Sequence, residues 1–491
     1  MAAPEPTYLL AGWLFLRLLG IIYLVAFASL ATQIKGLVGS NGILPAADFL
    51  ASRRGWGIRR FYRIPTLFWF NSSDGCLIFL SWTGAVLSLL VIVGIAPALV
   101  LASLWLLYLS VFSVGRIFLG YQWDILLLET GFLAIFVAPF ELTLHFPPTF
   151  APPLIVRWLL WWLLFRLMFS SGLVKLRSSD HTWRKLTALC HHYETQPLPT
   201  PLAWYAHQFP NFFHRISAAI MFVIELIVPF FIIGPPPLRH LAALLFIAFM
   251  ALIQLTGNYC FFNLLGIALS ILLLDDNLLL AAFRLFLRGL QLPPAAPPVL
   301  PEWFLAPVAV LILFLSVIPI LRLAHMEIFW PKALAALWEF FDPFRLVNSY
   351  GLFSVMTTQR PEIIVEGSRD GIHWQPYEFK WKPGDVKRAP RFVAPHQPRL
   401  DWQVWFAALS FYPNNPWFWR FLVRLLEGSA TVLSLLKTNP FADAPPRFVR
   451  AMLYDYRFTD AKQRWATKSW WQAERRGPYS PILDITELTA S

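Results

Sequence analysis

Long apolar runs recur along this chain, and each approaches the roughly 20 residues that an α-helix needs to cross a bilayer. They lie near 8–34, 76–96, 98–115, 119–140, 154–174, 213–233, 238–257, 260–281 and 303–324. Backbone N–H and C=O groups find no water inside a bilayer, so such runs satisfy them internally as helices. The sequence therefore predicts an all-α polytopic membrane protein with about nine transmembrane helices.

The composition agrees with this class. Of the 491 residues, 57% are hydrophobic and only 14% are charged, whereas a soluble domain carries about 25% charged residues. The net charge is +12, which in a membrane chain commonly reflects Lys and Arg in loops and at helix ends. Since the chain has no basic RNA-binding motif, we expect contacts with membrane lipids and none with nucleic acid.

After about residue 330 the composition changes. Residues 361–381, "PEIIVEGSRDGIHWQPYEFKW", alternate apolar and polar positions around Arg369-Asp370-Gly371, which predicts a β-hairpin. Aromatic-rich helices are predicted over 399–412 and 416–436, and a strand over 449–460. We therefore divide the chain into a transmembrane helical domain (1–330), a linker (331–347) and a small C-terminal extramembrane α/β domain (348–491).

Basic residues are distributed unequally between the two sides of the membrane. With nine spans, the arginines of 53–63, Arg116 and the basic residues of 175–185 share one side with the C-terminal domain. Cytoplasmic loops carry an excess of Lys and Arg, so the charges place this side in the cytoplasm. The segment 51–70 mixes Arg with aromatic residues and is typical of an interfacial segment rather than a span.

Asp124 and Glu129 interrupt one apolar run with charge. A carboxylate in a bilayer is costly unless it is paired or faces a polar cavity, and it marks a functional site by default. Most buried charges are paired, and Arg166 is the candidate partner for either acid. We therefore weigh an internal ion pair against a polar pocket, with Asp124, Glu129 and Arg166 as candidate binding residues.

The densest polar chemistry lies in 173–199, "LVKLRSSDHTWRKLTALCHHYETQPLP". Lys175 is either a basic anchor at the membrane surface or, if enclosed, a candidate general base, with His192 and Glu194 as assisting catalytic groups. Because the His, Cys and Glu residues lack the spacing of a metal site, we expect neither a metal nor a cofactor. The further candidate binding residues are Trp183, His191, Tyr193, Gln196, Asn348 and Tyr350.

A third polar group lies in the runs near 238–257 and 260–281. Asn and Gln side chains often hydrogen-bond one membrane helix to another, which is our interpretation of Gln254, Asn258 and Asn263. The pair Asp275-Asp276 falls near the end of its apolar run, so we expect both carboxylates to be solvated at the interface.

Four stretches carry a family resemblance: "YQWDILLLETGFLAIF", "WRKLTALCHHYETQPLPTPLAWYAHQFP", "VNSYGLFSVMTTQRPEIIVEGSRDG" and "PRFVAPHQPRLDWQVWFAAL". Together they resemble the lipase maturation factor family, in its order, from about residue 116 to about residue 456. The resemblance implies a protein that assists the folding of exported clients such as lipases. In animal members, the equivalents of the 175–212 loop and the C-terminal domain face the lumen of the endoplasmic reticulum. The shorter chain, rich in Arg, Pro and Leu, favours a bacterial member in the inner membrane.

A second resemblance concerns Lys175. The stretch "SSGLVKLRSSDHTW" is similar to a Lys-Leu…Trp stretch of the vitamin K-dependent gamma-glutamyl carboxylase, in which a lysine is the catalytic base. The match assigns that role to Lys175, but Trp183 is offset by a few residues and the glutamate-binding elements of the carboxylase are absent from the sequence.

Three hypotheses stay open. The first is a membrane-embedded maturation factor for exported proteins. The second is a membrane enzyme that acts on a lipid or quinone-like substrate, with Lys175 as general base. The third is an ion-coupled transporter with Asp124 and Glu129 as coupling carboxylates, although the sequence has no inverted-repeat pattern of broken helices.

Overall fold

The computed structural model describes residues 6–139, 141–143, 146–283, 292–294, 296, 300–323 and 331–489. Within these ranges, seven helices are long and apolar enough to cross a membrane. They are α1 (Leu9–Ala31), α5 (Asp74–Val93), α6 (Pro97–Gly115), α8 (Leu154–Arg177), α12 (Asn211–Leu226), α13 (Pro236–Thr256) and α16 (Glu302–Leu323). The 3-10 turns η3 (Arg116–Phe118) and η4 (Val228–Ile233) extend α6 and α12. The predicted all-α polytopic class is confirmed.

The described residues contain seven or eight spans, against about nine predicted. The helices α14 (Phe262–Ile271) and α15 (Asp276–Ala282) are bent by 113° and together make at most one span. The helix α7 (Gln122–Ile135) has 14 residues, which cover about 21 Å at 1.5 Å per residue. Because the hydrocarbon core is about 30 Å thick, α7 does not cross it alone, and the span predicted over 119–140 is shorter than expected.

The outer helices expose apolar side chains. In α13 and α16, only 22% of the residues in the apolar stretch are buried. Phe79 of α5 is 67% exposed and Val310 of α16 is 68% exposed. Such a surface is unfavourable in water and favourable in hydrocarbon. The chain is therefore a multi-pass membrane protein.

Short helices and turns occupy the loops. The predicted interfacial segment 51–70 forms short elements and no span, and the predicted linker 331–347 contains a helix. Within the described residues, the short helices and turns of all these loops are α2 (Ile34–Val38), α3 (Ala46–Ala51), η1 (Arg54–Trp56), α4 (Arg59–Arg63), η2 (Leu67–Trp69), α9 (His181–Arg184), α10 (Leu189–Thr195), α11 (Pro201–His207), α17 (Lys332–Phe341) and η5 (Asp342–Phe344).

The C-terminal part contains a five-stranded antiparallel sheet in the order β2-β1-β5-β6, with β7 also paired to β5. Ile363 and Val365 on β1 and Ala451 on β5 are fully buried on one face, and α18 packs on β1 and α19 on β5. The elements are β1 (Arg360–Ser368), β2 (Gln375–Pro376), β3 (Glu378–Phe379), α18 (Arg399–Ala408), η6 (Tyr412–Asn414), α19 (Pro416–Leu426), α20 (Ala430–Leu433), β4 (Leu436–Thr438), β5 (Phe448–Phe458), α21 (Ala461–Thr467), β6 (Trp471–Pro478), β7 (Leu483–Asp484) and α22 (Ile485–Thr489).

The predicted β-hairpin is present between β1 and β2. Gly371 in its turn has φ of +77°, a conformation that favours glycine. The Asp370 carboxylate accepts the backbone N–H groups of Ile372 and His373 at 2.8 Å each. The helix predicted over 399–412 is present as α18, and the strand predicted over 449–460 is present as β5. The helix predicted over 416–436 is broken near Gly428 into α19 and α20, and its last residue belongs to β4. The strand β6 was not predicted because its exposed side chains give it no apolar alternation.

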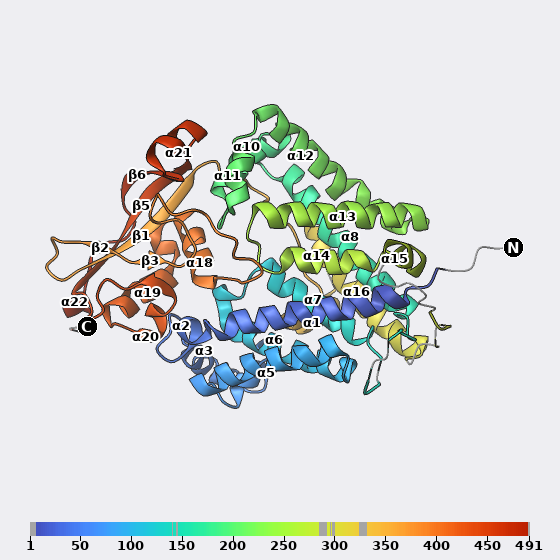
Figure 1. The fold of residues 1–491 in the computed structure, drawn as a ribbon. Helices are drawn as coiled ribbons and strands as arrows, with labels where there is room; N and C mark the ends of the chain where they lie inside the picture. Colours follow the sequence, from blue (N-terminus) through green and yellow to red (C-terminus); the bar gives the residue numbers. More distant parts are fainter. Residues whose placement is uncertain are drawn as a thin grey trace.

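The sheet lies at one end of the helical bundle, and the beginning of α1 lies at the other end, beside α15 (Figure 1). The 178–210 segment, with α10 and α11, reaches across to the sheet. There the Trp204 indole N–H donates to the backbone oxygen of Thr459 at 2.9 Å. The loop and the C-terminal part therefore lie on the same side of the bundle, which both the charge pattern and the family resemblance predict.

Candidate functional site

Glu129 of α7 anchors the beginning of the C-terminal part against the membrane helices. Its carboxylate pairs with the Arg166 guanidinium of α8. It also accepts the Asn348 backbone N–H at 2.9 Å, the Asn348 side-chain amide at 3.1 Å and the Tyr350 hydroxyl at 2.7 Å. All four side chains are buried. Four candidate binding residues therefore form one buried cluster. Of the two acids considered as partners of Arg166, Glu129 forms the ion pair.

Asp124 has a different partner. The guanidinium of Arg399 on α18 donates two hydrogen bonds to the Asp124 carboxylate, at 2.9 Å from Nη1 and 2.8 Å from Nη2. The Tyr108 hydroxyl donates a third bond at 2.5 Å, and Arg399 also donates to the Phe118 carbonyl at 2.6 Å. Both charged side chains are enclosed. Asp124 therefore joins the membrane helices to the C-terminal part.

Lys175 is enclosed and paired. Its Nζ lies 2.7 Å from each carboxylate oxygen of Glu225 on α12, and both side chains are buried. The ammonium also lies 5.5 Å from the centre of the Trp183 ring. The Trp183 indole donates to the Phe353 carbonyl at 2.9 Å. Of the two alternatives for Lys175, the structure supports the enclosed position and not the surface anchor, because the ammonium is buried against Glu225.

The predicted loop residues hold one tyrosine from two directions. The Tyr259 hydroxyl donates to the Gln196 side-chain oxygen at 2.7 Å and lies 3.2 Å from Nε2 of His192. The Gln196 amide donates in turn to the Thr256 carbonyl at 2.9 Å. Burial, together with the Lys175 charge, lowers the pKa of His192 to about 4. His192 is therefore neutral at neutral pH and serves as a hydrogen-bonding partner of Tyr259.

The turn after α10 is fixed mainly through its backbone. Arg360, the first residue of β1, donates to the carbonyls of Glu194 at 2.8 Å and Pro197 at 2.9 Å, and also to that of Gln196. The Glu194 carboxylate accepts the Phe458 backbone N–H at 3.0 Å, while burial raises the pKa of this carboxyl. Arg360, the first residue of β1, and Phe458, the last residue of β5, thus hold the turn in place.

An aromatic pocket of about 360 Å³ opens between these clusters. Its walls come from the beginning of α7, the turn after α10, the 351–357 segment and α18. The Trp123 and Trp402 rings meet edge to face at 4.8 Å, and Tyr121 stacks on Trp123 at 4.7 Å. The lining residues are Gly120, Tyr121, Gln122, Trp123, Pro197, Tyr259, Gly351, Leu352, Phe353, Ser354, Val355, Thr357, Trp402, Trp405, Phe406 and Leu409.

The predicted site residues lie behind the walls of this pocket. His192 and Gln196 hold Tyr259, Trp183 holds Phe353, and the Glu129 cluster fixes the chain just before Gly351. Two other predicted residues, His191 and Tyr193, flank His192 on α10. Tyr193 packs its ring 5.5 Å from that of His214, and His191 is half-buried on the same helix. The structure thus brings most of the predicted residues together as a supporting frame.

The third polar group connects elements. Asn258 donates to the Leu198 carbonyl at 3.0 Å and accepts the Val393 N–H at 2.7 Å, and Asn263 donates to Gln254 at 3.0 Å. The expected solvation of Asp275 and Asp276 is wrong, because both are buried. Asp276 accepts the N–H groups of Leu9 and Leu10 at the beginning of α1 at 2.9 and 2.8 Å, and Asp275 caps α15 and lies 3.2 Å from His240.

Four residues essential to this arrangement were missed from the sequence: Arg399, Glu225, Tyr259 and Arg360. Glu225 had a visible signal, since it is a single acid inside an apolar run. Arg399 lies far along the chain from Asp124, and Arg360 lies far from the turn carbonyls that it binds, so no local pattern indicates either contact. In the described part of the chain, no three His, Cys, Asp or Glu side chains gather to hold a metal ion.

The arrangement defines a multi-pass membrane protein that carries a folded extramembrane domain. A buried ion pair, Asp124–Arg399, and the hydrogen bonds of the Glu129 cluster join this domain to the membrane helices beside an aromatic pocket. A family model described as the lipase maturation factor transmembrane domain matches residues 10–281, and one described as the lipase maturation factor C-terminal domain matches residues 346–481. The chain belongs to the lipase maturation factor family.

Relatives in animals match nearly the whole chain. Lipase maturation factor 2 of Gallus gallus is 36% identical over 97% of this chain and 82% of its own length. Lipase maturation factor 1 of Homo sapiens is 35% identical over 99% of this chain and 91% of its own length. No solved structure matches the chain.

Proposed function

We propose that this protein assists the maturation of exported lipases by holding an incompletely folded client segment in the aromatic pocket. The names of its relatives supply the client class. The aromatic pocket between the membrane helices and the C-terminal part is the observation that carries the proposal. An incompletely folded chain exposes apolar side chains, and burying them gains about 25 cal/mol per Å².

The surface beside the pocket suits an extended client segment. Val355, Phe406 and Leu409, which line the pocket, are 61%, 43% and 39% exposed, and the neighbouring Phe411 is 79% exposed. A contiguous apolar surface on the extramembrane side marks an interaction site. Aromatic walls bind apolar side chains with little demand for a particular sequence, as a factor with several clients requires.

A positioning role for the predicted catalytic residues supports this function better than acid–base chemistry does. Both carboxylate oxygens of Glu225 face the Lys175 ammonium, His192 is occupied by Tyr259, and Glu194 accepts a backbone N–H. A general base must reach the proton that it abstracts. Each of these groups is instead directed at a protein partner that supports the pocket wall.

The proposal includes a location. Because the clients are exported, the pocket and the C-terminal domain (348–491) would face the exported side, beyond the transmembrane domain (1–330) and the linker (331–347). The sequence, rich in Arg, Leu and Pro, supports a bacterial inner membrane. The arginines of 53–63 and Arg116, which lie on the same side as the C-terminal domain, then do not mark a cytoplasmic side and require another role.

Photocrosslinking tests the client site. A photoreactive residue at Val355 or Phe406, in cells that co-express a secreted lipase, should crosslink to the lipase before it becomes active. The matched control is the same residue at Trp465, which is 86% exposed on α21 and does not line the pocket. Crosslinks from the pocket to lipid alone, or equal lipase crosslinks from Trp465, would contradict the proposal. Phe406→Ser should also lower the yield of active lipase several-fold at unchanged protein level.

A further inference from the structure

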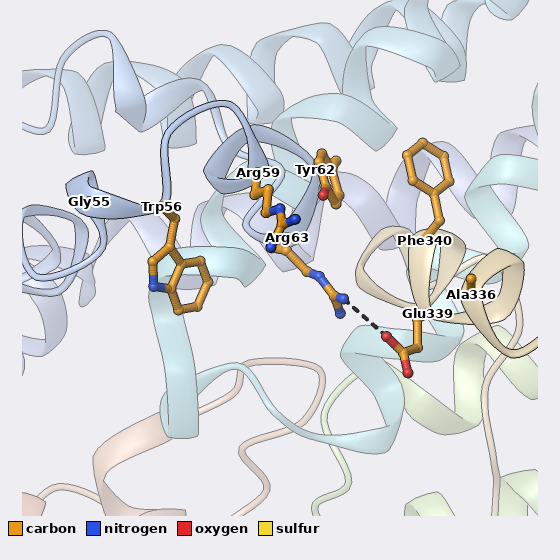
Figure 2. Close-up of a pocket in the computed structure, with 8 residues that line it drawn as sticks. All are labelled: Gly55, Trp56, Arg59, Tyr62, Arg63, Ala336, Glu339 and Phe340. Atoms are coloured by element: carbon orange, nitrogen blue, oxygen red, sulfur yellow. Dashed lines mark hydrogen bonds and ion pairs between the residues drawn. The ribbon is translucent and has the colours of Figure 1, made fainter. Parts of the chain in front are cut away.

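An arginine-rich segment lines a second cavity, which shares no lining residue with the aromatic pocket. Five of the eleven residues in 53–63 are arginines, and none is acidic. Between this segment and α17 lies a cavity of about 870 Å³. Figure 2 shows Trp56 on one side, α17 on the other, and Arg63 extending across the gap between them. The lining residues are Gly55, Trp56, Arg59, Tyr62, Arg63, Ala336, Glu339 and Phe340.

The cavity lies at the level where membrane helices end. The chain just after α4 is bonded to the last turns of α6, through Thr66 to the Ser110 carbonyl and through Ser113 to the Pro65 carbonyl, both at 3.0 Å. The helix α5 begins shortly afterwards at Asp74, and α17 follows the end of α16. Helix ends of this kind mark the boundary between hydrocarbon and lipid headgroups.

The charges around the cavity are unevenly matched. Arg63 pairs with Glu339 at 3.0 Å, and Arg60 lies over the Phe61 and Trp69 rings at 4.8 and 5.0 Å. Arg59 has no ion pair or hydrogen bond to any described residue. The cavity therefore presents two guanidinium groups against one carboxylate, and one of those guanidinium groups is available.

Apolar side chains surround this charge. Trp56, Ile58 and Phe61 are 44%, 80% and 43% exposed, and Leu337 and Phe340 on α17 are 42% and 43% exposed. Arginines mixed with exposed aromatic and aliphatic residues are suited to the membrane interface, where each type meets its preferred solvent. A ligand with an anionic head and a long apolar tail satisfies both parts of the surface.

We propose that this cavity is a binding site for an anionic phospholipid. Arg59 and Arg63 bind the phosphodiester, because guanidinium groups form charge-assisted bonds with phosphate oxygens. The acyl chains lie against the exposed apolar side chains of this segment and of α17. Glu339 opposes the headgroup charge and holds Arg63 when no lipid is bound. This site is independent of the client pocket and does not depend on the function proposed above.

Native mass spectrometry of the full-length protein, released from vesicles of mixed phosphatidylglycerol and phosphatidylcholine, tests the site. The wild type should retain phosphatidylglycerol preferentially. Arg59→Gln/Arg63→Gln should weaken the apparent affinity by about thirty-fold, as expected for two basic residues at about 1 kcal/mol each. Arg59→Gln alone should weaken it by about five-fold, and it leaves every described ion pair intact. Glu339→Gln should strengthen retention, because it removes the opposing charge and releases Arg63.

The matched control removes the same two charges elsewhere. Arg457 and Lys462 are exposed in the C-terminal part, and Arg457→Gln/Lys462→Gln should retain phosphatidylglycerol as the wild type does. Equal loss in this control, no lipid preference in the wild type, or weaker retention in Glu339→Gln would each overturn the proposal. Displacement of the lipid by an equal concentration of inorganic phosphate would assign the site to a free anion and overturn it as well.

Discussion

Asp124 and Arg399 are joined by two hydrogen bonds of 2.9 and 2.8 Å, although 275 residues separate them in the sequence. Asp124 lies on a membrane-domain helix too short to span the bilayer, and Arg399 is the first residue of the C-terminal helix α18. Both side chains are enclosed, so neither charge has water as an alternative partner. This pair, with the Glu129 cluster, makes the two parts of the chain mutually dependent.

Breaking this pair on one side should be more harmful than removing both charges. Asp124→Asn leaves a buried guanidinium without its counter-charge, which costs about 3–5 kcal/mol. Asp124→Leu/Arg399→Leu should recover part of this loss, which thermal unfolding in detergent would measure. Equal stability of Asp124→Asn and the wild type would mean that the pair contributes nothing, and it would reopen a functional role for a free Asp124.

The Lys175–Glu225 pair separates a positioning role from a catalytic one. Glu225→Gln should destabilise the protein by about 3–5 kcal/mol, since it leaves a buried ammonium unpaired. Lys175→Met/Glu225→Gln, which is neutral overall, should restore most of the stability and most of the yield of active lipase. A double variant with wild-type stability and no activity would instead support Lys175 as a general base.

Gly351 tests how tightly the pocket edge is fixed. A Cβ added there would lie 2.8 Å from a Val174 methyl group, so Gly351→Ala should cost about 1–3 kcal/mol through overpacking and displace the 351–357 wall. Val174→Ala should compensate. The control is Gly120→Ala in the same pocket, because the added Cβ would meet only the Arg116 carbonyl at 3.5 Å. Unfolding midpoints and lipase maturation would both be measured, and equal effects at the two glycines would contradict the prediction.

Stability should fall in mild acid. Burial lowers the pKa of His192 to about 4, against about 6.5 in an unfolded chain. Between these values the unfolded chain binds a proton that the folded protein does not. The stabilisation is therefore present above pH 6.5 and is lost toward pH 4, at about 1.4 kcal/mol per pH unit. His207 and His396 behave alike, since burial lowers the pKa of each to about 4.

Unfolding midpoints between pH 7.5 and 4.5 would check this dependence. His192→Gln should reduce the slope of the unfolding free energy against pH by the contribution of one bound proton. His181→Gln, at an exposed position on α9, should leave this slope unchanged. A slope that is the same in the wild type and His192→Gln would show that burial does not keep this imidazole neutral.

The sidedness of the protein can be measured directly. In a variant without Cys76, Cys190 and Cys260, Trp465→Cys on α21 should react with a membrane-impermeant maleimide applied from the exported side of intact cells. Thr7→Cys, at an exposed position at the opposite end of the bundle, should react only after the membrane is opened. The reverse pattern would place the C-terminal domain in the cytoplasm, as the loop charges predict.

The membrane helices could be predicted because the length of an apolar run reports bilayer thickness directly. The same rule overestimated α7, whose apolar residues, such as Leu126 and Leu127, are buried against protein rather than lipid. Hydrophobicity alone does not distinguish these two environments. The hairpin at Asp370-Gly371 was predictable for a local reason, since its turn chemistry lies within a few residues.

Predictions for the site divide along the same line. The importance of Glu129, Arg166 and Lys175 was evident, because charge inside an apolar run requires a partner. Their partners were less evident, since pairing depends on tertiary contacts that no spacing encodes. The aromatic pocket could not be predicted as such, because Trp123 and Trp402 come from separate parts of the chain and look like ordinary core residues.

The order of synthesis adds a consequence of the Asp124–Arg399 pair. A ribosome adds about 5–20 residues per second, so roughly 15–55 s pass between the appearance of the acid and that of its partner. Glu129 likewise waits for Asn348 and Tyr350 to complete its bonds. Until Arg399 has been made, Asp124 has the Tyr108 hydroxyl but no charged partner, which favours docking of α7 into the bundle late, together with the C-terminal domain. Docking of α7, the last step in assembling the membrane helices, then depends on the C-terminal domain. A chain truncated before Arg399 would not complete this docking.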